Sequence, residues 1–281
     1  MATGSVEAVK ELRERTGAGM MDCKAALQAS SGDIEKAIDF LRKKGMAHAA
    51  KRAGREAKEG LVVVCTTGAK AVLVEANCET DFVARTDDFR NLANLAADEV
   101  LAHGESAISS PKCADRIAEL SGKIGEKILI KRTKLFHSET GLIFSYVHSN
   151  HKLGVVVEIA CGKPESRKNP ALEEFGKNIA MQVAAGNPIC VSRAEVPQPI
   201  LEREKAIFKE EVKDKPAAIV DKIVQGKLGK FYQASCLLEQ PFIKDDKMSV
   251  QKLMDETAKK IGGTITIKQF VRFQLGETAA S

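Results

Sequence analysis

VLVEANC, at residues 72–78, is a short apolar run of strand length, and it recurs 83 positions later as VVVEIAC at residues 155–161. A partner strand precedes each copy, at residues 61–65 and at residues 142–147. The first pair of strands is joined by the turn-forming segment 66–70, which predicts a β-hairpin. A helical pattern follows both copies. The chain therefore carries one order of elements twice.

A second match lies farther along the chain. KIGEKILIKR, at residues 123–132, aligns with KIGGTITIKQ, at residues 260–269, and six of the ten residues are identical. The common order of hairpin, helices and third strand predicts an internal duplication of one α+β unit. We therefore expect an α+β fold with two core subdomains, one at residues 60–140 and the other at residues 141–193 and 231–276.

The second copy must contain an insertion, because the two matches are offset by 83 and by 137 residues. We place the insertion at residues 194–230, where two helical segments flank the turn Lys213–Pro216 and predict an antiparallel helical hairpin. The apolar positions expected to face each other are Ile200, Ile207 and Val212 on the first helix and Ile219, Ile223 and Leu228 on the second. Such an arm has little core of its own. It either projects into solvent or contacts a partner, which includes a second copy of the chain.

Three short helices are predicted for residues 1–45, because apolar residues recur there at helical spacing. Asp22 and Asp33 are the expected N-caps of the second and third helices. Met20 and Met21 stand together where the second helix begins. Either both pack inside, or one of them is an exposed and adaptable contact for a partner.

Positive charge is mildly concentrated from Arg42 to Lys58, where seven basic residues accompany a single acidic one, Glu56. We assign residues 46–59 to a basic helical linker, which is either a solvated helix face or a patch that contacts phosphates. The chain as a whole has a net charge of only +5, no Trp and two Tyr. Such a composition offers little surface for stacking bases.

Composition also bears on the compartment. The seven cysteines are widely spaced and form no C-x-x-C pair, which favours reduced thiols in a cytoplasmic protein and argues against a zinc site. The longest apolar runs have strand length, and the N-terminus lacks the pattern of a secretion signal. We therefore expect a cytoplasmic protein without a membrane span. A short tail, residues 277–281, follows the last predicted strand.

Catalytic motifs of the common nucleotide-binding, zinc-protease and hydrolase types are absent from the sequence. His148 and His151 have a spacing that metal ligands use, but no Cys or carboxylate accompanies them on the same loop. Cys78 precedes Glu79 and Asp81, whose charges raise the pKa of a thiol. We expect no catalytic residue, no metal and no cofactor, and hence no enzyme.

The segment most suggestive of function is NCETDFVAR, at residues 77–85, because it connects a buried type of strand to a helix. Within it, Asp81 puts a carboxylate beside the bulky ring of Phe82. In one interpretation, Asp81 caps the helix and Phe82 belongs to the core. In the other, Phe82 is an exposed wedge that enters a pocket on another protein while the carboxylate perturbs the charges next to it.

Several motifs resemble the signatures of the translation elongation factor Ts family. They are TGAGMMDCKAAL at residues 16–27, GDIEKAI at 32–38, TDFVAR at 80–85, YVH with LGV at 146–148 and 153–155, and LEQPFIKD at 238–245. The resemblance runs in order along nearly the whole chain. The loop at residues 149–152 departs from the family pattern, which usually has more glycine and an arginine at Lys152.

The resemblance implies a guanine-nucleotide exchange factor for elongation factor Tu. It implies a three-helix N-terminal domain like a ubiquitin-associated domain, a two-part α+β core and a helical arm that often mediates dimerisation. Thr80, Asp81, Phe82 and Val83 would enter the GTPase near its Mg²⁺ and phosphate site. Met20 and His148 would make further contacts with the GTPase.

Two alternatives belong to other classes of protein. The first is an RNA-binding accessory protein of translation that uses residues 42–58, and it predicts binding to RNA with a steep dependence on salt. The second is an enzyme with an unrecognised cysteine site, for which replacement of Cys78 would abolish activity.

Overall fold

The computed structural model describes residues 5–139 and 141–277. Residues 1–4 of the predicted N-terminal domain and residues 278–281 of the predicted tail lie outside this part. Three helices begin the chain: α1 (Val6–Thr16), α2 (Met20–Ala29) and α3 (Ile34–Arg52). Their common core consists of Leu12, Cys23, Ala26, Leu27 and Ala37. These three helices are called the N-terminal module below.

One of the two predicted helix caps is correct. Asp33 accepts a hydrogen bond from the Lys36 N–H (3.1 Å) and so caps α3, as predicted. The cap of α2 is Gly19, and Asp22 lies inside the helix, so that prediction was wrong. The Asp22 carboxylate instead accepts a hydrogen bond from Lys44 Nζ (2.8 Å) and ties α2 to α3.

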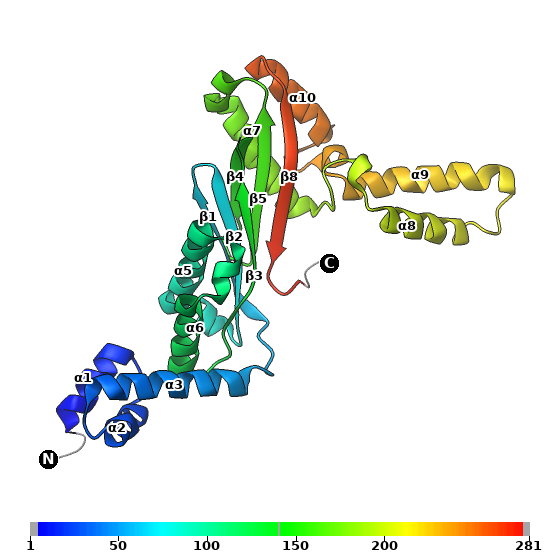
Figure 1. Cartoon of the computed structure of the whole chain (residues 1–281). Helices are drawn as coiled ribbons and strands as arrows, with labels where there is room; N and C mark the ends of the chain where they lie inside the picture. The colour runs from blue at the N-terminus through cyan, green and yellow to red at the C-terminus, as the bar shows by residue number, and fades with distance from the viewer. Residues whose placement is uncertain (1–4, 140, 278–281) are drawn as a thin grey trace.

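The third helix is longer than its apolar pattern predicts. It runs without a break to Arg52, so residues 46–52 of the predicted linker continue α3. The middle of α3 crosses α6 (Pro111–Ile124) at two glycines, Gly45 and Gly122. A Cβ added to Gly122 would lie 3.4 Å from the Gly45 Cα atom. The close crossing fixes the N-terminal module on the core (Figure 1).

The first half of the core is a three-stranded antiparallel sheet with helices on one face. Its strands are β1 (Glu59–Thr67), β2 (Lys70–Cys78) and β3 (Leu129–His137), in the order β1-β2-β3. Between β2 and β3 the chain forms α4 (Asp81–Ala84), α5 (Asp87–His103), the 3-10 turn η1 (Glu105–Ser109) and α6. The predicted hairpin at residues 66–70 is confirmed, since β1 pairs with β2.

The second half repeats this plan. Its strands are β4 (Gly141–Val147), β5 (Leu153–Cys161) and β8 (Ile265–Gln274), in the order β4-β5-β8. The helices are α7 (Pro170–Gly186) and α10 (Val250–Ile261), and the short elements are η2 (Pro164–Lys168), η3 (Arg193–Glu195), η4 (Leu237–Glu239), β6 (Pro241–Phe242) and β7 (Asp245–Ser249). The predicted α+β fold is confirmed.

The duplication holds down to the strand register. In the first sheet the ladder is interrupted between Glu75 and Ala76, and in the second between Glu158 and Ile159, 83 positions later. Glu75 stands opposite Arg132 and Glu158 opposite Gln269, which are 137 positions apart. Both offsets found in the sequence are therefore offsets of the structure.

The two sheets pack on each other through their helix-free faces. Val62, Ala71, Leu73 and Phe136 of the first sheet form one cluster with Val156 and Phe273 of the second. The Val62 N–H also donates a hydrogen bond to the His151 carbonyl (2.7 Å). The core is therefore a single body, with α5 and α6 outside one sheet and α7 and α10 outside the other (Figure 1).

The insertion is an arm of two antiparallel helices, α8 (Gln198–Glu210) and α9 (Ala217–Ser235), that projects from the second half (Figure 1). Helix α9 continues beyond residue 230, where we expected the insertion to end. Between the helices lie Val212, Val224 and Leu228, with Leu201, Phe208, Val220, Ile223 and Tyr232 around them.

The predicted inner face of the arm was wrong for three residues. Ile200, Ile207 and Ile219 are exposed. On α8 the inner positions are Leu201 and Phe208, each one residue later than the predicted isoleucine, and one residue turns a helix by about 100°. The arm consequently exposes apolar side chains along its outside.

Within residues 5–139 and 141–277, no helix combines the length and hydrophobicity that crossing a bilayer requires.

Candidate functional site

The connection after β2 presents a large apolar side chain to solvent. Phe82, in the first turn of α4, is 79% exposed. The next two residues, Val83 and Ala84, are buried against the core of the first half. The anchored residues hold the chain down while Phe82 projects from it. Residues 79–82 are called the tip below.

The structure decides between the two interpretations of Asp81 and Phe82. Thr80 is the N-cap of α4, and its Oγ1 atom accepts from the Val83 N–H (3.4 Å). Asp81 is therefore the first helical residue and not the cap. Its carboxylate accepts a hydrogen bond from the exposed Arg85 guanidinium (2.7 Å). The interpretation with a capping Asp81 and a buried Phe82 was wrong, and the exposed wedge remains.

Two glutamates brace the tip. Glu126 Oε2 accepts hydrogen bonds from the N–H groups of Glu79 and Thr80 (3.0 Å each), and its Oε1 accepts one from the Thr80 hydroxyl (2.6 Å). In return, Glu79 Oε1 accepts from the Lys127 N–H (2.6 Å). The Lys127 N–H, assisted by Arg55, holds the pKa of the Glu79 carboxyl below its usual range. We call these reciprocal bonds the carboxylate brace.

Sequence analysis named Glu79 only as a neighbour of Cys78, and it missed Glu126 altogether. The signal was present in the duplicated stretch, where the first copy reads KIGEK and the second KIGGT. The second copy has glycine where the first copy has Glu126, so the shared fold does not require a charge at this position. The charge therefore indicates a role of another kind.

Both methionines at the start of α2 are exposed, Met20 to 59% and Met21 to 75%. The interpretation that both pack inside was wrong. The turn before them lies against α6, because a Cβ on Gly17 would stand 3.0 Å from Lys123 Cε. Lys123 is three residues from Glu126. The turn between α1 and α2 therefore meets the end of α6.

His148 is exposed just after β4, and its Nδ1 atom is hydrogen-bonded to the Tyr146 hydroxyl (2.9 Å). Its turn is tied to β1, because Lys152 Nζ donates to the Glu59 carboxylate (2.7 Å). Glu59 stands opposite Cys78 in the ladder, two residues before Thr80. The His148 turn and the tip consequently lie at the same end of the first sheet.

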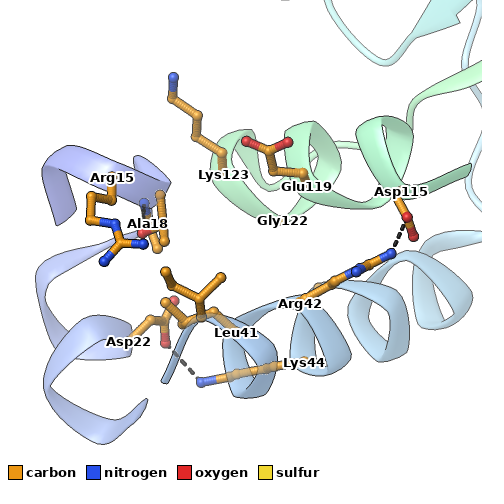
Figure 2. Close-up of a pocket in the computed structure, with 13 residues that line it drawn as sticks. Arg15, Ala18, Asp22, Leu41, Arg42, Lys44, Asp115, Glu119, Gly122 and Lys123 are labelled. Carbon is orange, nitrogen blue, oxygen red and sulfur yellow. Dashed lines mark hydrogen bonds and ion pairs between the residues drawn. The ribbon is translucent and has the colours of Figure 1, made fainter. Parts of the chain in front are cut away.

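A cavity of about 380 Å³ lies between the N-terminal module and α6. Figure 2 shows Leu41 and Ala18 within it and charged side chains around it, with Arg42 bonded to Asp115 and Lys44 bonded to Asp22. The opposite charges in these two pairs cancel each other beside the point where Gly45 and Gly122 meet. Phe82 is not among the residues that line the cavity. The cavity and the tip are separate features.

The cysteines have the character of buried structural thiols. All seven are free, and Cys65 alone is partly exposed. Burial raises the pKa of the Cys78 thiol from 9.0 to about 12, and Glu126 and Glu59 add to the rise. These carboxylates, rather than Glu79 and Asp81, are the acidic neighbours responsible. Burial likewise raises the pKa of Cys190, whose Sγ atom lies 3.7 Å from that of Cys236, to about 12. In the described residues no group of His, Cys, Asp and Glu could hold a metal ion.

We expect Cys78 to resist alkylation in the folded protein at pH 8. A rise from 9.0 to about 12 lowers the thiolate fraction on the order of a thousandfold, and only the thiolate reacts. Pulse labelling with iodoacetamide, read by mass spectrometry of peptides, measures this in buffer and in urea. Cys65 is the internal reference and should be labelled first. Equal labelling rates of Cys78 in the folded and unfolded protein would contradict the prediction.

Comparisons with known proteins show which family the sequence resembles. The family model described as "Elongation factor TS" matches residues 79–277, beginning at the tip. An elongation factor Ts of Prosthecochloris aestuarii is 45% identical and covers 98% of this chain and 100% of the relative. One from Clostridium perfringens is 44% identical over 97% and 93% of the two chains, and one from Bdellovibrio bacteriovorus 43% over 97% and 92%.

Proposed function

The chain belongs to the elongation factor Ts family, and on that premise we propose that it is a guanine-nucleotide exchange factor for elongation factor Tu. The observation that carries the proposal is the exposed ring of Phe82 beside the Asp81 carboxylate on a braced tip. The protein acts by binding rather than by catalysing a reaction of its own, and needs no metal or cofactor. Its proposed place of action is the cytoplasm, where translation takes place.

Exchange of this kind is a coupling between two binding events. A GTPase holds GDP through Mg²⁺ and through backbone N–H donors around the phosphates. A protein that binds better when those groups are displaced must weaken nucleotide binding, and the nucleotide must weaken protein binding by the same factor. A coupling of about 3 kcal/mol is already more than a hundredfold in affinity.

The tip suits this task. The Phe82 ring is free to enter an apolar gap between helices of the GTPase, where its burial contributes on the order of 2 kcal/mol. The Asp81 carboxylate enters with it. Its partner in the free factor, Arg85, is an exposed neighbour one helical turn away, and such pairs are weak and easily exchanged. A carboxylate brought next to the Mg²⁺ and phosphate site disturbs the charge balance that holds GDP.

Thr80 and Val83 flank these two groups, but Val83 is buried against the core of the first half, so it anchors the segment and is not proposed as a direct contact. Met20 and His148 are the further proposed contacts, because both are exposed, and the turn of His148 lies at the same end of the first sheet as the tip. The outer isoleucines of the arm (Ile200, Ile207 and Ile219) support a contact with a second copy of the chain. Membranes and nucleic acids are not among the proposed partners.

Among the described residues, the basic segment gives the RNA-binding alternative little support. Five of the seven basic residues between Arg42 and Lys58 already donate to groups of the protein. The pairs are Arg42 with Asp115, Lys44 with Asp22, Arg52 with the Ser121 carbonyl, Arg55 with Glu79, and Lys58 with Glu56. The segment therefore offers phosphates less free charge than its composition indicates.

The deciding experiment is release of a fluorescent GDP analogue from purified elongation factor Tu, chased with unlabelled GDP, with and without this protein. We expect faster release and a stable complex with the nucleotide-free GTPase. The RNA-binding alternative predicts no change in release, together with retention of RNA that falls steeply with salt. Identical release rates with and without the protein would reject the proposed function.

A further inference from the structure

The carboxylate brace joins two loops that are far apart in the sequence. Glu126 accepts three hydrogen bonds from Glu79 and Thr80, and Glu79 accepts one from Lys127. Hydrogen bonds to an ionised carboxylate are among the stronger ones in proteins. The brace therefore holds the residues that lead into Asp81 and Phe82.

The duplication supplies a comparison within the same molecule. In the second half, Gly162 and Lys163 occupy the positions of Glu79 and Thr80, and Gly263 and Thr264 those of Glu126 and Lys127. There the corner closes with a backbone bond, from the Gly162 N–H to the Thr264 carbonyl (3.0 Å). The same fold is thus completed without carboxylates. The brace belongs only to the half that carries the tip.

Other bonds at the two corners are shared and serve the fold. Cys78 Sγ donates to the Thr80 carbonyl (3.1 Å), and Cys161 Sγ donates to the Lys163 carbonyl (3.4 Å) in the same way. The cysteine bonds occur in both halves and therefore belong to the fold. Glu79 and Glu126 occur only in the half that carries the tip, so their bonds serve the tip.

The tip depends on the brace because α4 is very short. A helix of four residues, Asp81–Ala84, cannot hold its own geometry. Its start is set by Thr80, and the backbone N–H and hydroxyl of Thr80 are both bound by Glu126. Lys127 extends the support, since its Nζ atom donates to the carbonyls of Ala53 (2.5 Å) and Arg55 (2.8 Å) after α3.

We propose that Glu126 is a positioning residue that preorganises Asp81 and Phe82 for entry into the GTPase. This inference rests on the proposed function. Because the brace orders the tip before binding, no ordering cost has to be met when the ring is buried in the partner. Glu126 itself touches only the factor, and its effect passes through the tip.

The test compares Glu126→Ala with a matched control, Glu195→Ala. Glu195 also accepts a backbone N–H and a hydroxyl, from Val191 (3.2 Å) and Ser192 (2.8 Å), but lies at the base of the arm. We expect Glu126→Ala to lower the maximal rate of GDP release roughly tenfold, and Glu195→Ala to leave it unchanged. Urea unfolding of both variants shows whether they fold.

Two readouts separate positioning from a general structural role. Amide hydrogen exchange should show lost protection at Glu79 and Thr80 in Glu126→Ala, with strand β2 still protected. In a variant that carries both Asp81→Ala and Phe82→Ala, the Glu126→Ala substitution should add no further loss, because it acts only through these two side chains.

The outcomes are distinct. If the wild-type protein does not accelerate GDP release, the proposed function fails and the positioning role fails with it. If the wild type is active and Glu126→Ala is equally active, the positioning role alone is overturned. A further loss when Glu126→Ala is added to the Asp81→Ala and Phe82→Ala variant, or an equal loss in Glu195→Ala, overturns it as well.

Discussion

Replacement of Phe82 by alanine should slow GDP release from elongation factor Tu in the proposed exchange reaction by about thirtyfold. The figure follows from burial of one phenylalanine ring, on the order of 2 kcal/mol, if that contact is made in the complex and not in the free factor. The ring is 79% exposed in the free protein, so its removal takes almost nothing from the core. Activity should fall while the free energy of unfolding stays the same.

The measurement is the release rate of fluorescent GDP at increasing concentrations of the variant, together with a urea unfolding curve. Asp81→Ala should also slow release, because it removes the carboxylate that acts beside the ring. Ile207→Ala is the control, since it removes an exposed apolar side chain from the arm instead. Normal exchange by the double variant of Asp81 and Phe82 would falsify the assignment of the tip.

The substitution Gly60→Ala should destabilise the protein by about 3 kcal/mol or more. Gly60 lies in β1 with a φ of +145°, a backbone conformation that residues other than glycine rarely adopt. A Cβ there would stand 2.0 Å from the Ala76 carbonyl oxygen and 2.9 Å from the Asn77 Cα atom. Both are backbone atoms of the neighbouring strand. The sheet must therefore move to admit the methyl group.

Gly68→Ala is the matched control for this prediction. Gly68 lies in the turn of the same hairpin, also at positive φ (+56°), but a Cβ added there would have no atom within 4 Å beyond its chain neighbours. Its replacement should cost only about 1 to 2 kcal/mol, for the strained backbone alone. Urea denaturation followed by circular dichroism measures both. Equal losses of stability in the two variants would contradict the prediction, because they would mean that the sheet makes room for the methyl group at Gly60 without further cost.

The duplication could be predicted from the sequence because strand pairing preserves register. Within each strand the offset is constant, 83 in the second strand and 137 in the third, so the two ladders are equivalent and even the bulge after Glu75 recurs after Glu158. The family motifs also identified the tip, because the end of a strand followed by the start of a helix is a pattern of neighbouring residues.

Features that depend on helix phase or on distant partners could not be predicted so well. Ile200 and Ile207 have helical spacing, but Leu201 and Phe208 have the same spacing, and only packing against α9 selects between the two faces. Thr and Asp are both favourable N-caps, so the sequence does not distinguish Thr80 from Asp81. In the structure α4 begins at Asp81, and Thr80 is therefore its cap. Glu126 is 46 residues from Thr80, so no local pattern connects them.

The unbroken helix α3 has a consequence for partner selection. Its 19 residues form a rod about 28 Å long. One end carries the N-terminal module with Met20. The glycine crossing at Gly45 holds the middle of α3 on α6, and the bond from Arg52 to the Ser121 carbonyl (3.0 Å) holds its other end there. The tip is tied to the chain just after that end, since Arg55 pairs with Glu79. The separation between Met20 and Phe82 is therefore set by the fold, and in the proposed complex the two surfaces of elongation factor Tu that receive them must lie that far apart.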